Sequence, residues 1–292
     1  MIKEFQNFAN NNTKDSGQKW HQLRNSYGHL IIDMFKQIQF GKGRALLFGA
    51  GNGNDIPIDF FEYFFEEIVV VDIDQEALDR LMSKVVRRDK FTSIVIDLSG
   101  LTNEMHNVEL NSIPISEEWV NKLNPKPDLS CITGKFDLIM NCNYSTQLCL
   151  SIVRYVSDHS ISQQTLSGIA ELINRIQTEI FQSIHVLLNE NSIFIHSTDI
   201  IEVSLNKITG EKSKTYDYVM NAINNDTSQL SNILDILPEL SKQNLLINGS
   251  QLPENYKILF DCTKLDLLLW PFESSDRGER SLIVVVYMFR KQ

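Results

Sequence analysis

The sequence predicts an α/β protein in which amphipathic helices pack on a mostly parallel β-sheet. Short apolar runs alternate with helical patterns from Ala45 to His196, which is typical of successive βαβ units. A glycine-rich turn begins at Gly49, between the first apolar run and the first of these helices. Two more apolar runs, Leu265–Trp270 and Ser281–Phe289, are joined by the polar link PFESSDRGER and predict a terminal hairpin.

Length and charge limit the class of protein. A chain of 292 residues is long enough for one large α/β domain with insertions, or for two small ones. Its 27 basic and 37 acidic residues give a net charge of −10. That balance disfavours a nucleic-acid substrate, because phosphate binding draws on clustered Lys and Arg.

The sequence shows no sign of a membrane segment or a metal site. The first residues contain no apolar core of signal-peptide length, and nowhere do about 18 apolar residues run together. We therefore expect a cytoplasmic protein that does not contact a membrane. The cysteines form no C-x-x-C pair, so we expect reduced thiols without zinc or a disulfide framework. They are Cys131, Cys142, Cys149 and Cys262.

The segment before the first strand predicts one helix. Residues 1 to about 17 are polar and rich in asparagine, and we expect the very end to fray. From Gln18 to Ile38, apolar residues recur at steps of three and four, which predicts an amphipathic helix.

The stretch from Gly43 to Asp74 predicts a nucleotide-type site. Ala45–Phe48 is a short apolar strand, and the turn GAGNG follows it, where glycine permits positive φ and a close approach of ligand to backbone. Asn54 and Asp55 offer helix caps, and Pro57 suits a first helical turn. A second strand, Ile68–Val71, leads into Asp72. This carboxylate follows Gly51 by about 20 residues, the spacing at which it can meet a ribose.

The G-x-G-x-G turn with an acidic residue after the next strand resembles motif I and the acidic motif of class I S-adenosylmethionine-dependent methyltransferases. A dinucleotide fingerprint would need glycine at Asn54, so a nicotinamide dehydrogenase is disfavoured. The resemblance covers roughly residues 40–200 and 260–292. It implies a Rossmann-like three-layer sandwich, with a seven-stranded, mostly parallel sheet whose last strand is antiparallel. Many members carry an acidic residue where this chain has Leu47.

The remaining elements continue the alternation. Residues 99–134 predict a helix and a long loop, and residues 202–257 predict a helical insertion that covers the substrate. We therefore divide the chain into an N-terminal helical lid segment, 1–40, and a methyltransferase domain, 41–292. The other predicted elements are the helices Gln75–Val86, Ser145–Ser157 and Gln163–Asn189, and the strands Ser93–Ile96, Phe136–Tyr144 and Ser192–His196.

The resemblance also implies roles for individual residues. The cofactor residues it implies lie at the glycine turn and at the ends of the next strands: Gly49, Ala50, Gly51, Gly53, Asp55, Asp72, Ile73, Asp97, Leu98 and Asn141. Asp72 would bind the ribose hydroxyls, and Asp97 with Leu98 would bind adenine. The substrate residues it implies are Trp20, His21, Arg24 and Tyr27 of the lid helix, with Asn143. His196 and Tyr144 are the candidate catalytic bases. Plain structural roles remain open for all of these: a packing helix, a turn aspartate and a hydrogen-bonded rim histidine.

These residues predict a methyltransferase that uses S-adenosylmethionine to methylate an oxygen or nitrogen of a small molecule or peptide. The sulfonium already activates the methyl group, so the protein must align donor and acceptor and exclude water. The tetrapeptide NCNY at Asn141–Tyr144 lacks the prolines of N-P-P-Y, which disfavours methylation of adenine or of a glutamine amide. Two alternatives stay open: an aminopropyl-type transferase on the same fold, and a non-catalytic protein that binds S-adenosylmethionine.

Overall fold

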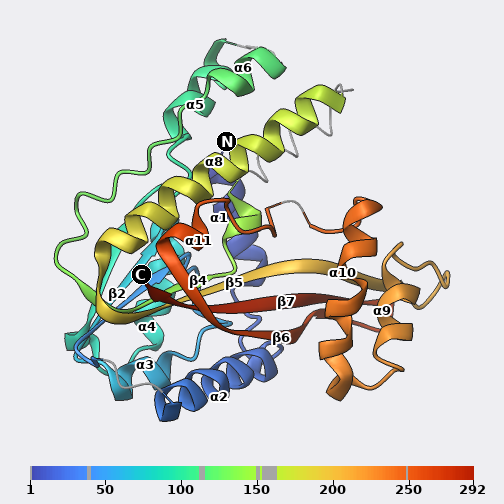
Figure 1. The fold of residues 1–292 in the computed structure, drawn as a ribbon, viewed down its shortest axis with the longest axis horizontal. Coiled ribbons are helices and arrows are strands. Elements are labelled where there is room, and N and C mark those ends of the chain that lie inside the picture. Colours follow the sequence, from blue (N-terminus) through green and yellow to red (C-terminus); the bar gives the residue numbers. More distant parts are fainter. Residues whose placement is uncertain (1, 38–40, 112–115, 149–151, 153–162, 248) are drawn as a thin grey trace.

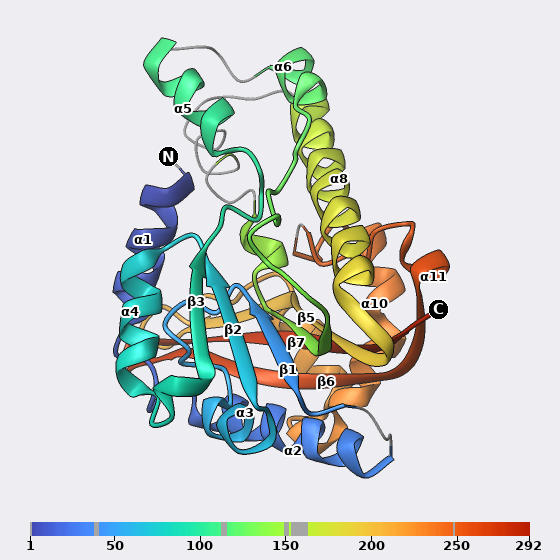
Figure 2. The same ribbon diagram turned by 90° about the vertical axis from the view of Figure 1, so that its left-hand side faces the viewer.

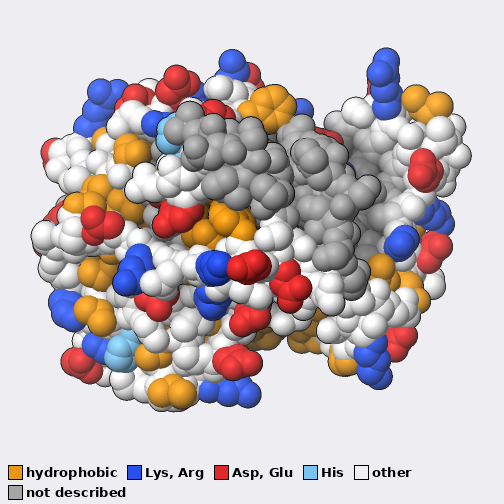
Figure 3. All heavy atoms as spheres, turned by 90° about the horizontal axis from the view of Figure 1, so that it is seen from above, with side chains coloured by type: hydrophobic (Ala, Val, Ile, Leu, Met, Phe, Trp, Pro, Cys, Tyr) orange, Lys and Arg blue, Asp and Glu red, His pale blue; other side chains and the backbone are white. Residues whose placement is uncertain are grey.

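The fold was analysed in a computed structural model that describes residues 2–37, 41–111, 116–148, 152, 163–247 and 249–292. Cys149, Ile38 and most of the predicted helix Ser145–Ser157 lie outside the described residues. Among the described residues, no helix is both long and apolar enough to cross a membrane. On the face seen from above, acidic and basic side chains of the described residues are interspersed (Figure 3).

A single seven-stranded sheet forms the centre of the molecule, in the order β3-β2-β1-β4-β5-β7-β6 (Figure 2). The strands β1 to β5 pair in parallel, whereas β7 is antiparallel to both of its neighbours. This order and the antiparallel C-terminal end are typical of the class I methyltransferase fold, so the predicted fold is confirmed. The strands are β1 (Arg44–Phe48), β2 (Glu67–Asp72), β3 (Phe91–Val95), β4 (Phe136–Cys142), β5 (Leu188–Asn206), β6 (Phe260–Ser274) and β7 (Gly278–Lys291).

Helices cover both faces of the parallel strands (Figure 1). Because successive residues of a strand point to opposite faces, Ala45 and Leu47 enter one core and Leu46 and Phe48 enter the other. The first core is closed by α2 (His21–Gln37), α3 (Ile58–Phe64) and α4 (Gln75–Lys84). The second is closed by α5 (Thr102–Asn111), α6 (Glu117–Lys122), α8 (Gln163–Leu187) and α11 (Tyr256–Leu259). Short 3₁₀ turns are η1 (Arg88–Lys90) and η2 (Ser145–Gln147).

The strands β5, β7 and β6 continue beyond the carboxyl ends of the parallel strands and form an antiparallel extension (Figure 1). Its outer face carries α9 (Tyr216–Ala222), η3 (Thr227–Asn232) and α10 (Ile233–Lys242), packed on a third apolar cluster that includes Val203 and Ile283. Helices were predicted in this region, but as a cover for the substrate. In the structure they lie on the face of the extension that points away from the cavity described below. Among the described residues of the predicted insertion, only Glu202 and Ile247 line that cavity.

The first residues form a helix, α1 (Ile2–Thr13), where a polar segment with a frayed end was expected. Asn10 anchors it, because its side-chain amide donates to Asp74 at 3.0 Å and its carbonyl accepts from Asn52 at 2.8 Å. The Asn54 side chain also donates to the Thr13 carbonyl at 2.7 Å. Asn54 therefore ties the glycine turn to α1 and does not cap α3, which begins after Pro57 without a side-chain cap.

Candidate active site

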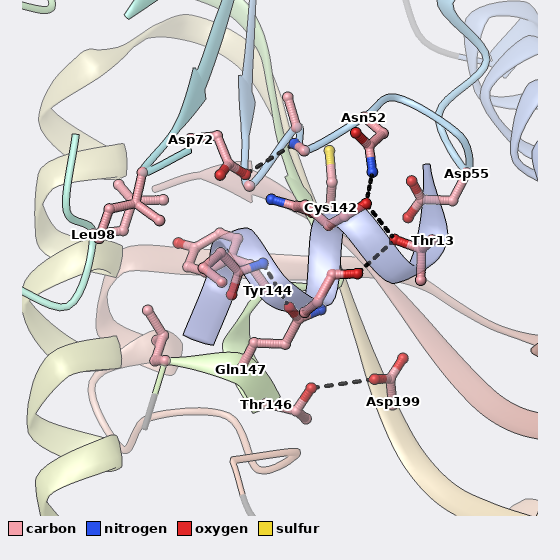
Figure 4. Close-up of a pocket in the computed structure, with 18 of the residues that line it drawn as sticks. Thr13, Asn52, Asp55, Asp72, Leu98, Cys142, Tyr144, Thr146, Gln147 and Asp199 are labelled. Carbon is pink, nitrogen blue, oxygen red and sulfur yellow. Dashed lines mark hydrogen bonds between the residues drawn. The ribbon is translucent and has the colours of Figure 1, made fainter. Parts of the chain in front are cut away.

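A cavity of about 490 Å³ opens outside the carboxyl ends of β1 to β4. This edge is where open α/β sheets bind ligands, and the volume falls in the range of about 300–1,000 Å³ that is usual for small-molecule sites. The lining comes from α1, from the glycine turn, from the ends of β2, β3 and β4, and from the inner face of the extension. In Figure 4, Asp72 and Leu98 lie on one side of the cavity, Asp55 and Asp199 on the other, and Tyr144 between them.

The glycine turn has the backbone conformation for which glycine was invoked. Gly49, Gly51 and Gly53 have φ values of +67°, +46° and +64°. At Gly49 a β-carbon would lie 2.5 Å from Cβ of Tyr144, and at Gly53 it would lie 3.0 Å from the Leu81 side chain. Gly49, Ala50 and Gly51 line the cavity, whereas Gly53 packs against α4 behind it.

Asp72 lies at the end of β2 and lines the cavity beside Ile73. Its carboxylate accepts from the Gly51 amide at 2.9 Å and from the Asp74 amide at 3.0 Å. A carboxylate has about four lone-pair positions, so these two bonds orient Asp72 and leave it able to accept from a ligand. Burial raises its pKa to about 6. This geometry suits a carboxylate that accepts from ribose hydroxyls.

The predicted contact of Asp97 with adenine does not fit the structure. One carboxylate oxygen accepts from the amide and hydroxyl of Ser99, and the other accepts from the amides of Leu101 and Thr102 and from the Thr102 hydroxyl. Asp97 therefore caps the start of α5, where the first amides have no partner within the helix. Asp97 and Leu98 both line the cavity, but the Asp97 carboxylate is already engaged, whereas Leu98 with Ile73 and Ile96 supplies apolar surface for a base.

His196 and Asn141 lie outside the cavity, contrary to prediction. The apolar run does not end at His196, since β5 continues to Asn206, and the imidazole is fully buried in the core. Its Nδ1 lies 2.7 Å from Nδ2 of Asn141, and burial lowers its pKa to about 3. A general base must reach its substrate, so His196 cannot serve as one here.

We expect His196→Ala to destabilise the fold by about 2–4 kcal/mol, because it opens a cavity and leaves Asn141 Nδ2 with the Ser145 hydroxyl as its one remaining partner. Urea unfolding measures the effect. The matched control is His29→Ala, an exposed histidine on α2, which we expect to change the free energy of unfolding by less than about 0.5 kcal/mol. A normally stable His196→Ala protein without activity would restore the catalytic role.

Tyr144 lines the cavity, but it does not have the properties of a base. Its hydroxyl is buried and has no partner among the described residues, and burial raises its pKa well above the usual value. The phenol therefore keeps its proton at neutral pH. It can donate a hydrogen bond to a ligand but cannot take a proton from one.

The predicted lid helix α2 packs under the sheet and not over the cavity. Tyr27 is buried and donates to Asn143 at 3.1 Å, so both are core residues. Arg24 donates to the carbonyls of Gly17 and Asn54, and His21 is exposed. Of the substrate residues predicted, Trp20, which immediately precedes α2, lines the cavity.

The extension supplies cavity residues that the sequence analysis missed. A β-bulge at Ile200 shifts the register, so that Asp199 pairs with Val284 and Glu202 with Leu282. Paired residues of antiparallel strands point to the same face, so the bulge places Asp199 and Glu202 together on the inner face. Asp199 accepts from the Thr146 hydroxyl at 3.2 Å, while its Oδ1 has no partner among the described residues. Burial raises its pKa to about 7.

Aromatic side chains close the far end of the cavity. The ring centroids of Trp20 and Trp270 lie 4.8 Å apart, and Phe272 lies 5.3 Å from Trp20 and 5.1 Å from Trp270. Trp20 Nε1 donates to the Phe272 carbonyl at 3.2 Å. Arg280 stacks over Phe272 at 5.0 Å and pairs with Glu202 at 2.8 Å. We call Trp20, Trp270 and Phe272 the aromatic cluster.

The α1 helix lines the cavity, where the sequence analysis expected α2. Six of its residues line the cavity: Ile2, Phe5, Gln6, Ala9, Asn10 and Thr13. The apolar members recur at helical spacing, which is the signal that could have identified this helix. Within the part of the chain that the structure describes, no group of three His, Cys, Asp or Glu could hold a metal ion.

The pH dependence of stability should report on the buried Asp199. Its pKa rises from 3.8 in the unfolded chain to about 7, so between these values the folded protein holds a proton that the unfolded chain does not. Stability is therefore lost as pH rises, by up to about 1.4 kcal/mol per pH unit. His196 has the opposite effect, but only below its unfolded pKa of 6.5. We expect the melting temperature to decrease as the pH is raised from 6.5 to 7.5. In Asp199→Asn this decrease should be smaller. An equal slope in both proteins would contradict the assignment.

Sheet order and cavity together define the class to which the chain is compared: proteins with the class I methyltransferase fold. No protein-family model and no curated protein matches the sequence. Solved structures of many S-adenosylmethionine-dependent methyltransferases match most of the chain at low identity. These matches concern the fold alone.

Three of the matches illustrate their range. TehB from Haemophilus influenzae is 9% identical with a TM-score of 0.43, and the match covers 90% of this chain but 61% of that one, less than two thirds of its length. A SAM-dependent methyltransferase from Anabaena variabilis is 11% identical, with coverage of 95% and 96% and a TM-score of 0.43. The N-methyltransferase NodS from Bradyrhizobium japonicum, in complex with S-adenosylhomocysteine, is 10% identical, with coverage of 95% and 86% and a TM-score of 0.36.

Proposed function

We propose that the protein is an S-adenosylmethionine-dependent methyltransferase that acts on a nitrogen or oxygen of a small molecule or peptide. One observation carries the proposal. The glycine turn holds the buried carboxylate of Asp72 through the Gly51 amide, and both line a cavity at the carboxyl edge of the sheet. A nucleoside with free ribose hydroxyls suits this arrangement.

Residues that line the cavity would suit the ribose, the adenine ring and the ammonium group of the cofactor. Asp72 would accept from the ribose hydroxyls, and Leu98 with Ile73 would contact the adenine ring. Leu47, at the position where many methyltransferases are acidic, is fully buried between β2 and β4 and cannot reach the cavity. Asp55 lines the cavity beside the glycine turn, so it would bind the ammonium group of the methionine part in its place. The cofactor supplies an activated methyl group, and the protein aligns the acceptor with it and excludes water.

Calorimetric titration of the full chain tests the proposal. S-adenosylmethionine and S-adenosylhomocysteine should bind in the micromolar range, and NADH should not bind. Decarboxylated S-adenosylmethionine separates the aminopropyl-type alternative, which requires it to bind more tightly than S-adenosylmethionine. Absence of binding by any adenosyl compound would reject the proposal, and binding without transfer to any acceptor would favour the non-catalytic alternative.

We expect Asp55→Asn to weaken S-adenosylhomocysteine binding by about tenfold or more, as for the loss of a hydrogen bond between charged groups. The carboxylate lies inside the cavity, where burial raises its pKa to about 6, and a bound ammonium would compensate its charge. Asp59→Asn, a change at an exposed aspartate on α3, is the matched control and should leave affinity unchanged. Unchanged affinity in Asp55→Asn would show that another group binds the ammonium.

A further inference from the structure

We propose that the methyl acceptor is an amine, bound as its ammonium ion between Asp199 and the aromatic cluster, and that Asp199 accepts its proton. This inference rests on the proposed function and names the substrate class of the same site. His196 and Tyr144, the bases predicted from the sequence, take no part in this proton transfer.

Sheet order separates the donor end of the cavity from the acceptor end. The nucleoside residues Asp72 and Leu98 follow β2 and β3, and the glycine turn follows β1. Asp199 lies on β5, three strands from β2 and therefore about 14 Å away across the sheet. Beyond it, β7 supplies Arg280, and β6 supplies Trp270 and Phe272 of the aromatic cluster. A cofactor on β1 to β3 would thus present its reactive end towards Asp199.

The surroundings of the Asp199 carboxylate favour the binding of a cation. The residue is 7% exposed and lines the cavity, and its buried Oδ1 has no partner among the described residues. The one side-chain partner it has there is the Thr146 hydroxyl, a neutral donor (Figure 4). A buried carboxylate with an open oxygen is costly unless a charged donor completes its hydrogen bonds.

The aromatic cluster favours the same kind of ligand. Trp and Phe faces attract an ammonium group within about 6 Å of the ring centroid, most strongly where water is excluded. Phe272 already holds one cation in this way, the guanidinium of Arg280. Trp20 and Trp270 are 5% and 4% exposed, so a ligand between the cluster and Asp199 would be largely desolvated. The cluster also provides apolar surface for the body of the amine.

The charges at this end leave one carboxylate without a cation. Glu202 is paired with Arg280, and the cofactor ammonium would compensate Asp55, whereas Asp199 has no basic partner at hydrogen-bond distance among the described residues. Burial, and then the charge of Asp55, raises the pKa of Asp199 to about 7, while Arg280 opposes that rise. The Tyr27 phenol also faces Asp199 from α2 but is neutral. A carboxylate of this pKa can accept a proton from an ammonium group at neutral pH.

The reaction balances with these groups alone. The ammonium transfers one proton to the Asp199 carboxylate and becomes a neutral amine with a free electron pair. That pair forms the new bond to the methyl carbon as the bond from carbon to sulfur breaks, and its electrons remain on sulfur. The product is a methylated ammonium ion with S-adenosylhomocysteine, and Asp199 returns its proton to water.

A pair of probes with the same skeleton tests the acceptor class. Phenethylamine and phenethyl alcohol are titrated by calorimetry into the full chain saturated with S-adenosylhomocysteine, with spermidine as a second amine. An amine should bind at least tenfold more tightly than the alcohol. With S-adenosylmethionine, mass spectrometry should detect the methylated amine and not the methyl ether. Equal binding of amine and alcohol, or methylation of the alcohol alone, would overturn the inference.

Asp199→Asn assigns the effect to this carboxylate. The variant should lose the preference for the amine, at least tenfold, while it binds S-adenosylhomocysteine within twofold of the natural chain, which also shows that it folds. Asp59→Asn is the matched control and should keep both properties. If Asp199→Asn does not fold, Phe272→Leu, at a partly exposed member of the cluster, should lower amine affinity by roughly threefold and alcohol affinity less.

The two proposals fail in different ways. A chain that does not bind S-adenosylhomocysteine contradicts the proposed function, and the transfer to an amine with it. A chain that binds S-adenosylhomocysteine but no amine, or whose amine affinity survives in Asp199→Asn, contradicts the acceptor assignment alone.

Discussion

Gly49→Ala should lower the free energy of unfolding by about 2–4 kcal/mol. Two costs add at this position. A residue with a β-carbon is strained at a φ of +67°, and the added carbon would lie 2.5 Å from Cβ of Tyr144. Because Tyr144 lines the cavity, its displacement should also weaken cofactor binding.

Gly210→Ala separates these two costs. Gly210 has a φ of +73°, close to that of Gly49, but a β-carbon there would meet nothing within 4 Å. The control should therefore show the backbone strain alone, about 1–2 kcal/mol, with unchanged S-adenosylhomocysteine affinity. Urea unfolding and calorimetry on both variants provide the comparison. Equal destabilisation by the two substitutions would mean that Tyr144 moves aside freely.

Asp72→Ala should weaken S-adenosylhomocysteine binding by about 1–3 kcal/mol, the range for lost hydrogen bonds to a charged group. The carboxylate is already oriented by the amides of Gly51 and Asp74, so little further ordering is needed when a ribose binds. Calorimetry measures the effect in a variant whose fold is verified by circular dichroism. Asp79→Ala, at an exposed position on α4, is the control. A folded Asp72→Ala protein with normal affinity would remove Asp72 from the site.

The parts of the molecule that the sequence predicted well depend on local patterns. The positive φ values of Gly49, Gly51 and Gly53 could be predicted because they belong to one short turn. The position of Asp72 at the end of β2 could be predicted from the length of one βα unit. The seven-stranded sheet follows from the alternation of apolar runs with helices. Leu47 departs from the acidic residue that many methyltransferases carry at this position. Its side chain is buried in the core and does not line the cavity.

The errors arose where distant segments meet. The predicted strand ended at His196, but β7 pairs with Ser197, Thr198 and Asp199, and β5 continues to Asn206. The bulge at Ile200 that turns Asp199 into the cavity depends on that pairing. Sequence periodicity does not reveal which strands pair.

Two site elements were misassigned for other reasons. Asp97 was predicted to bind adenine because it follows β3. In the structure its carboxylate instead accepts hydrogen bonds from the amides at the start of α5. The lid was sought in α2 because its apolar residues recur at helical spacing. Those residues pack against the sheet, and α1 lines the cavity instead.

A crystal structure of the protein with S-adenosylhomocysteine would test the account most directly. We predict the ribose hydroxyls on the Asp72 carboxylate, the adenine ring beside Leu98, and the sulfur on the side of the cavity that faces Asp199. Asp97 should keep its bonds to the start of α5. A nucleoside bound outside this cavity, or one whose ribose does not contact Asp72, would contradict both the proposed function and the acceptor end derived from it.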